Sequence, residues 1–224
     1  MRQKNIIKLN LGSGPSGIEN WLNFDWGILP LLSKLSMLRK IIISLKLLNK
    51  EYDIKWPKIK LVDIRKRFPF NNSTVDYIYC SHVLEHFYPW ETVKILGECK
   101  RVLKNNGRMR IVVPDIKKMT KKYLETRSHL SKNSESRPGL ELCRLWWGYN
   151  KDQKPINLIQ KIKRLFIRDH QWNYDFAELS NILKEVGFSK IKESDFLRGK
   201  FPDIDKLDLP HYQDHSLYIE IIKS

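Results

Sequence analysis

The sequence has few cysteines, and its N-terminus lacks the features of a secretory signal. The three cysteines, Cys80, Cys99 and Cys143, are an odd number at wide spacings, which excludes a disulfide scaffold and a domain built on paired zinc-binding cysteines. A short apolar run follows the N-terminal residues without a small-residue cleavage site. We therefore interpret the cysteines as buried structural thiols and expect the protein in the reducing cytoplasm.

Acidic residues are also scarce. The chain has 25 of them against 41 lysines and arginines, a net charge of +16. Residues 28–68 hold 11 basic and three acidic side chains, and residues 99–132 hold 11 and two. Charge concentrated in this way favours an anionic partner such as a phosphorylated substrate, an acidic lipid or nucleic acid. A lysine-rich face that meets only water is the alternative.

Residues 28–50 contain no acid at all. Leucines and isoleucines recur there with helical spacing between basic residues, which predicts a basic amphipathic helix or helix pair. The basic side chains would each cost about 2.5–3.5 kcal/mol near a bilayer centre, so the segment does not span a membrane. We interpret 28–56 as an insertion in a single domain covering 1–224. It is either a cap over a ligand cleft or an element that contacts a membrane surface.

A short apolar strand, Ile6–Leu11, runs directly into the glycine turn Gly12-Ser13-Gly14-Pro15-Ser16-Gly17. The spacing Gly-x-Gly-x-x-Gly matches a dinucleotide fingerprint, but that motif needs a helix to begin at the third glycine. The next strand, Trp21–Asp25, follows too closely to leave room for a helix. The sequence therefore predicts a ligand that has a ribose but no pyrophosphate.

Further strands are predicted at 58–64, 75–80, 108–113, 190–196 and 216–222, with helices at 90–103 and 176–186. This alternation predicts an α/β fold with an open, mostly parallel sheet, whose ligands bind at the carboxyl ends of the strands. Residues 116–168 give no clear pattern. The strand ends bring one group of polar and glycine residues to a common rim: Gly12, Gly14, Asp25, Asp63, Ser81, His82 and Asp115.

Four runs, Leu9–Gly14, Leu22–Asp25, Asp76–Phe87 and Glu98–Asp115, together resemble the class I S-adenosylmethionine-dependent methyltransferases. The most similar branch is the small type-11-like enzymes often associated with cell-surface glycan biosynthesis. The resemblance implies a Rossmann-like, seven-stranded, mostly parallel sheet with helices on both faces. Its last strand, Ser216–Ile222, would run antiparallel to the others. It also implies S-adenosyl-L-methionine as the cofactor.

The resemblance assigns cofactor contacts residue by residue. Asp25 would accept hydrogen bonds from both ribose hydroxyls, and Asp63 with Ile64 would bind the adenine. The methionine and sulfonium end would lie against a second group: Gly12, Ser13, Gly14, Ser81 and His82. Asn10 stands where the family often has an acid, so the cofactor's amino group would be held more weakly or through water.

The resemblance further implies methyl transfer to a hydroxyl, of a sugar in a surface glycan or a glycan precursor, and the basic composition favours an anionic acceptor. Such a reaction needs a group that removes the hydroxyl proton. We predict His170 as this base because its loop precedes the helix that rejoins the sheet, and its ordinary pKa suits the role. His82 and Asp115 are the other candidates.

Three other interpretations are less favoured. His82-x-x-Glu85-His86 matches an inverted zinc-peptidase motif, but the lysine-rich sequence downstream offers no third ligand, so we expect no metal. A non-catalytic nucleic-acid or membrane-binding module would explain the charge but not two acids at a ligand-binding rim. As the methyl acceptor, nucleic acid, for which the chain has no recognised binding motif, and another small molecule remain alternatives.

Overall fold

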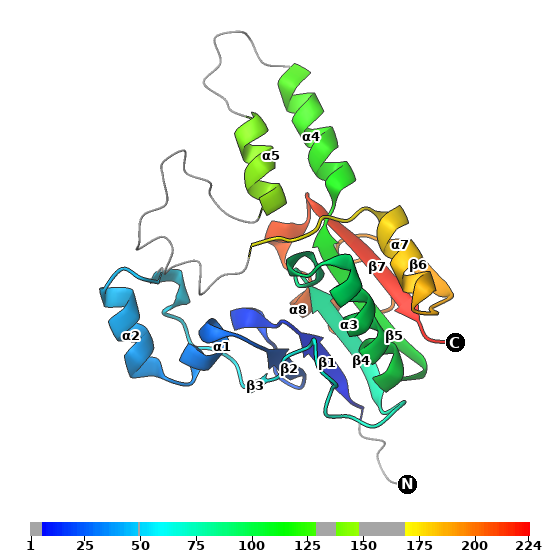
Figure 1. Cartoon of the computed structure of the whole chain (residues 1–224), viewed down its shortest axis with the longest axis horizontal. Helices are drawn as coiled ribbons and strands as arrows, with labels where there is room; N and C mark the ends of the chain where they lie inside the picture. Colours follow the sequence, from blue (N-terminus) through cyan, green and yellow to red (C-terminus); the bar gives the residue numbers. More distant parts are fainter. Residues whose placement is uncertain (1–5, 49, 129–137, 148–168) are drawn as a thin grey trace.

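The computed structural model describes residues 6–48, 50–128, 138–147 and 169–224, and its centre is one seven-stranded sheet (Figure 1). The strand order is β3-β2-β1-β4-β5-β7-β6. Strands β1 to β5 run parallel, whereas β7 is antiparallel to both of its neighbours, β5 and β6. The predicted fold class, including the antiparallel last strand, is confirmed. The strands are β1 Lys8–Leu11, β2 Leu22–Asp25, β3 Ile59–Leu61, β4 Val75–Ser81, β5 Leu103–Pro114, β6 Lys190–Ser194 and β7 Ser216–Ile222.

Helices and short 3-10 turns connect these strands. The α-helices are α1 Ile28–Ser33, α2 Ser36–Ser44, α3 Pro89–Val102, α4 Ile116–Ser128, α5 Pro138–Trp147, α7 Phe176–Glu185 and α8 Ile204–Leu207. The 3-10 turns are η1 Gly14–Ser16, η2 Lys50–Tyr52, η3 Leu84–His86 and η4 Pro210–Tyr212. Helices α3 and α7 lie together beside the sheet, while α4 and α5 extend away from it (Figure 1).

The two faces of the sheet bury different partners because side chains alternate along each strand. In β4, Ile78 and Cys80 join the large core that α3 and α7 complete, whereas Tyr79 points to the opposite face. There Tyr79 packs in a smaller apolar cluster with Phe201 and Leu207 of the segment after β6. We call residues 195–212 the C-terminal arm, and it covers this second face.

Arg110 of β5 holds the C-terminal arm against the sheet. Its guanidinium is fully buried and pairs with Asp208 at 2.6 Å and Glu220 at 3.1 Å. It also donates to the backbone carbonyls of Asp195 and Arg198 at 2.8 and 3.0 Å. A single buried cation therefore joins both parts of the arm to β5 and β7.

Several predicted boundaries differ from the structure. Strand β3 ends at Leu61, so Asp63 lies two residues beyond it. The polar run 105–107 resembles a helix stop, but α3 already ends at Val102 and the run lies inside β5, where the pairing register with β4 shifts. Cys143 is exposed on α5, contrary to the expectation of three buried thiols, because α5 projects from the sheet. Of the unassigned stretch 116–168, the structure describes α4 and α5, and the rest lies outside the described residues.

The predicted helix pair in the insertion is present as α1 and α2, beside the β3 edge of the sheet (Figure 1). In α2 several apolar side chains face solvent, and a basic side chain is buried instead. The buried member of α2 is Arg39, 3.9 Å from Asp53, whereas Met37, Ile41 and Leu45 are exposed to solvent. The insertion is therefore not held in place by an apolar face of α2.

Candidate cofactor and catalytic site

The glycine turn after β1 has the conformation that its sequence requires. Gly12 and Gly14 both have positive φ, at 60° and 51°, a region that side chains disfavour and glycine enters freely. A Cβ atom at Gly12 would also collide with the side chain of Val83, whereas the space beside Gly14 is open. The turn continues as η1, and no α-helix follows before β2. The absence of a pyrophosphate-binding helix, predicted from spacing, is confirmed.

Asp25, at the end of β2, is joined to this turn. Its Oδ2 accepts a hydrogen bond from the Gly14 amide at 2.7 Å, and its Oδ1 accepts one from the Trp26 amide at 2.7 Å. Burial raises the pKa of Asp25, although both amide hydrogen bonds act in the opposite direction. Each carboxylate oxygen has a second lone pair, so an oriented acceptor remains available for hydroxyl donors.

Asp63 lies near Asp25 but is already paired. Arg65 binds it through two parallel hydrogen bonds of 2.8 and 2.9 Å, and this guanidinium lowers the pKa of the Asp63 carboxyl. The neighbouring Ile64 is buried and offers an apolar surface. Asp63 is therefore a less available acceptor than Asp25.

Two cavities meet at the glycine turn and share Gly12, Gly14, Pro15, Tyr52 and His82 in their walls. The first, of about 520 Å³, we call the cap cavity because α1 closes one side. Its wall includes Asp25, Asp63, Ile64, Ile28, Leu29, Pro30 and Trp56. The second, of about 430 Å³, we call the arm cavity. Its wall includes Asn10, Ser13, Ser81, Tyr79, Leu207, Leu209 and Tyr212.

The residues predicted for the two ends of the cofactor thus divide between two adjoining cavities. Those assigned to the nucleoside line the cap cavity, and those assigned to the methionine end line the arm cavity. Asn10 is buried and donates to Asn23 Oδ1 at 3.3 Å. Methyltransferases of the class that the sequence resembles often have an acid at this position. The Asn10 amide offers both a hydrogen-bond donor and an acceptor instead.

His82 lines both cavities and has an unusual backbone. Its φ is 53°, a left-handed conformation that is uncommon for a side chain of this size. One ring nitrogen, Nε2, lies 3.0 Å from Ser216 Oγ, and the other, Nδ1, lies 3.2 Å from Glu85 Oε1. The ring also stacks on Tyr212 of the arm, with centroids 3.5 Å apart. Contacts on every side fix the imidazole at the junction of the cavities.

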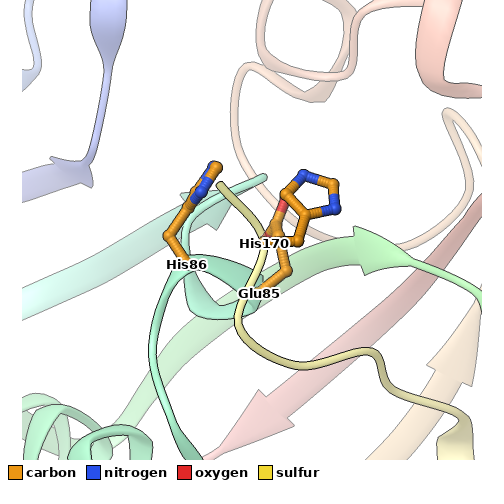
Figure 2. Close-up of side chains that lie close together, drawn as sticks. All are labelled: Glu85, His86 and His170. Carbon is orange, nitrogen blue, oxygen red and sulfur yellow. The ribbon is translucent and has the colours of Figure 1, made fainter. Parts of the chain in front are cut away.

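Behind His82 lies a buried carboxylate surrounded by histidines. Glu85 is fully buried, and His170 Nε2 lies 4.0 Å from its Oε1 (Figure 2). Burial alone would raise the pKa of Glu85, but the interactions with His82, His86 and His170 outweigh it and lower this pKa. Burial lowers the pKa of His170.

The two other predicted bases line neither cavity. His170 packs behind the cavity wall, where its Nδ1 lies 3.1 Å from the Trp146 carbonyl oxygen. Asp115 is buried at the start of α4, and its Oδ1 accepts from the Lys117 amide at 2.9 Å. Asp115 therefore caps α4, because its carboxylate accepts a hydrogen bond from a backbone amide of the first turn.

The zinc-peptidase interpretation fails on geometry. It requires His82 and His86 on one face of a helix, but His82 follows the end of β4 in a left-handed conformation, and only Leu84–His86 forms a 3-10 turn. Sequence reasoning also missed wall residues from distant segments, among them Tyr52, Trp56 and Tyr212. The length of the segment before β7 was the only sign that it would reach the site.

Comparison with known proteins agrees with this geometry. Residues 37–111 match the family described as "Methyltransferase domain". The match and the fold support an S-adenosylmethionine-dependent methyltransferase. The matched range begins after the glycine turn and Asp25, so the match does not include those residues. No curated protein matches the chain.

Solved structures with the same fold share little sequence with this chain. They include the PH0226 protein of Pyrococcus horikoshii (17% identity, TM-score 0.50, covering 100% of this chain and 84% of that one). A methyltransferase of Thermotoga maritima, described as a possible histamine N-methyltransferase, has 10% identity, a TM-score of 0.50 and coverages of 97% and 82%. The CurJ carbon methyltransferase has 13% identity, a TM-score of 0.50 and coverages of 100% and 50%. These likenesses establish the fold.

The residues present fit S-adenosylmethionine, which the family match implies. The bare backbone at Gly12 and Gly14 permits close approach, and Asp25 is an oriented acceptor for a ribose. The adjoining cavities offer an apolar side for the adenine at Ile64 and a polar side for an amino acid at Asn10 and Ser81. Asp25, Gly12 and Gly14 would therefore hold the cofactor.

Proposed function

We propose that the protein transfers a methyl group from S-adenosylmethionine to a hydroxyl of an anionic sugar, in a surface glycan or a glycan precursor. The observation that carries the methyl-transfer part is Asp25, hydrogen-bonded to the glycine turn within the cap cavity. The glycan acceptor rests on the sequence resemblance. An anionic acceptor is supported by the many lysines and arginines of residues 28–68, which include the cap beside the site.

When bound, the cofactor supplies an electrophilic methyl group. The chain must then align the acceptor oxygen and remove its proton as the new carbon–oxygen bond forms and the carbon–sulfur bond breaks. Of the three candidate bases, His82 lines both cavities, whereas His170 and Asp115 line neither. We therefore assign proton removal to His82, with Ser216 and Tyr212 fixing its ring.

The acceptor test uses the full chain with cofactor carrying a labelled methyl group and a panel of nucleotide sugars, glycolipid extracts, small phenols and RNA. We expect mass spectrometry to find the label on a sugar oxygen. His82→Ala should lower turnover at saturating cofactor by about 10²- to 10⁴-fold, the usual contribution of a general base. The control is Tyr123→Ala, because Tyr123 lies on α4 and lines neither cavity.

Label on RNA, on nitrogen or on carbon would contradict the proposed acceptor while leaving methyl transfer intact. A loss of less than about fivefold in His82→Ala, with cofactor affinity retained, would remove His82 as the base.

We also propose that α1 and α2 dock the protein on an anionic membrane surface, where a membrane-bound acceptor would lie. Exposed apolar side chains gather there, at Ile28, Leu31, Leu35, Met37, Leu38, Ile41 and Leu45. Lys34, Lys40 and Lys46 are exposed between them, and the segment has no acid. Apolar groups that enter the headgroup region beside lysines that meet anionic lipid are typical of interfacial helices. Among the described residues, no helix has the length and apolar content needed to cross a bilayer.

Flotation with vesicles of anionic and of neutral lipid tests this docking. We expect binding to anionic vesicles that weakens with salt, and we expect Met37→Ser/Ile41→Ser to reduce it more than tenfold, since each buried apolar side chain contributes about 1.5–3 kcal/mol. The control is Leu124→Ser, which removes an exposed apolar side chain from α4, outside the insertion. Equal binding by the two variants, or no binding by the parent, would contradict the proposal. Cofactor binding should be unchanged, because neither Met37 nor Ile41 lines the cap cavity.

A further inference from the structure

Glu85, His86 and His170 bring three metal-binding groups together from separate parts of the chain. Glu85 and His86 belong to η3, whereas His170 comes from the segment before α7 (Figure 2). One carboxylate oxygen and one nitrogen from each histidine lie within 4.8 Å of one another. Two imidazoles and a carboxylate are ligands that Zn²⁺ and related divalent transition metals prefer.

A second observation concerns the carboxylate itself. Glu85 is fully buried, and neither of its oxygens accepts a hydrogen bond from the residues that the structure describes. The nearest donor is His82 Nδ1 at 3.2 Å, without the alignment of a regular hydrogen bond. A buried carboxylate costs several kcal/mol unless a positive charge or donors compensate it. The neighbouring imidazoles favour the ionised carboxylate, but neither oxygen has a hydrogen-bond donor among the described residues, so both can serve as ligands to a cation.

The histidines are also oriented as metal ligands usually are. His170 Nδ1 lies 3.1 Å from the Trp146 carbonyl oxygen, and His86 Nδ1 lies 3.4 Å from that of Asp169. A ring N–H that donates to a backbone carbonyl leaves the other nitrogen with a free lone pair, the arrangement that fixes metal-binding histidines. Both rings thus present Nε2 as the available ligand atom, and that of His170 lies 4.0 Å from Glu85 Oε1.

We propose that Glu85, His86 and His170 bind a divalent transition metal of the zinc class. Ligand atoms about 2.0–2.2 Å from a tetrahedral ion lie about 3.4 Å apart, so binding draws the three groups together by rotamer adjustments of about 1 Å. Three protein ligands leave the fourth position open, and one of them, His86, lines the cap cavity. The site differs from the zinc-peptidase motif, since His170 replaces His82. It does not depend on the proposed acceptor.

The test measures metal binding directly on the full chain. After treatment with chelator and dialysis, the protein is titrated with Zn²⁺ against a chromophoric competitor and, separately, with Co²⁺ while visible absorption is recorded. We expect one equivalent of each metal to bind, with Co²⁺ bands of a low-symmetry site with nitrogen and oxygen ligands. His86→Ala and His170→Ala should each weaken Zn²⁺ binding at least 100-fold, and Glu85→Gln should do the same without changing side-chain volume.

His215→Ala is the control for adventitious binding by histidines, because His215 lies outside the three-residue group. Far-UV circular dichroism checks that each variant is folded, and Glu85→Gln keeps the test valid if a histidine variant does not fold. No stoichiometric Zn²⁺ or Co²⁺ binding by the parent would overturn the proposal, as would equal affinities in the parent and His86→Ala/His170→Ala. Since binding is read without any acceptor, failure here is distinct from failure of methyl transfer.

Discussion

Replacing Arg110 with methionine is expected to lower the free energy of unfolding by about 3–5 kcal/mol, the usual cost of breaking a buried ion pair from one side. Arg110 is completely buried, and its guanidinium is paired with Asp208 and Glu220. Without it, the buried Asp208 carboxylate loses its partner. For a domain of this size the loss corresponds to a fall in Tm of about 10 °C.

Denaturant unfolding of Arg110→Met beside Arg65→Met measures this effect. Arg65 also pairs with an aspartate through two short hydrogen bonds, but it is 45% exposed, so its loss should cost about 1 kcal/mol or less. The double variant Arg110→Met/Asp208→Asn should recover part of the stability because it removes the unpaired charge. Equal midpoints for Arg110→Met and the parent would show that the pair does not hold the arm. We expect weaker cofactor binding as well, since Leu207 and Leu209 of the arm line the arm cavity.

The second large effect is expected at Asp25, where replacement by alanine should weaken S-adenosylmethionine binding by about 10²- to 10⁴-fold. Two hydrogen bonds from ribose hydroxyls to a carboxylate contribute about 1.5–3 kcal/mol each. The side chain also accepts from the Gly14 amide, so the variant loosens the turn that approaches the cofactor. Calorimetry with the cofactor and its demethylated product measures both losses together.

Asp63→Asn is the comparison for the other acid of the cap cavity: the Arg65 guanidinium already donates to both of its oxygens and weakens it as an acceptor, so we expect a change of less than about tenfold. The parent should also lose affinity on acidification. Hydroxyls donate to the ionised carboxylate, and burial raises the pKa of Asp25, so binding should fail at a less acidic pH than for an ordinary aspartate. Unaltered affinity in Asp25→Ala would contradict the placement of the cofactor at Asp25, and no binding by the parent would contradict the cofactor assignment.

The order of the strands and the position of the glycine turn beside Asp25 could be predicted from the sequence. Short apolar runs indicate the strands, and the close spacing of Gly17 and Trp21 is enough to exclude a pyrophosphate-binding helix. Asp25 could be placed because residues at the carboxyl ends of parallel strands share one edge of the sheet. These inferences need only local sequence and a general rule of topology.

The catalytic end could not be predicted in this way. In the sequence, His170 and His82 are both plausible bases. Their positions in loops do not indicate which side chain reaches a cavity. The structure places His82 in both cavities and His170 behind them, against Glu85. The left-handed backbone at His82 has no sequence signal, because tertiary contacts with Ser216 and Tyr212 hold it.

The sequence by itself determined the sheet, its mostly parallel order and the glycine turn, because apolar periodicity and glycine spacing act over a few residues. Tertiary structure alone decided which charges are buried. Arg110 and Arg39 look like surface residues in the sequence, yet both are buried. Arg110 holds the C-terminal arm, and Arg39 lies on the buried side of α2, near Asp53. Likewise, Glu85, His86 and His170 meet only because the chain between η3 and α7 returns to the same place. Desolvation and long-range pairing depend on what folds over a residue, which no local pattern encodes.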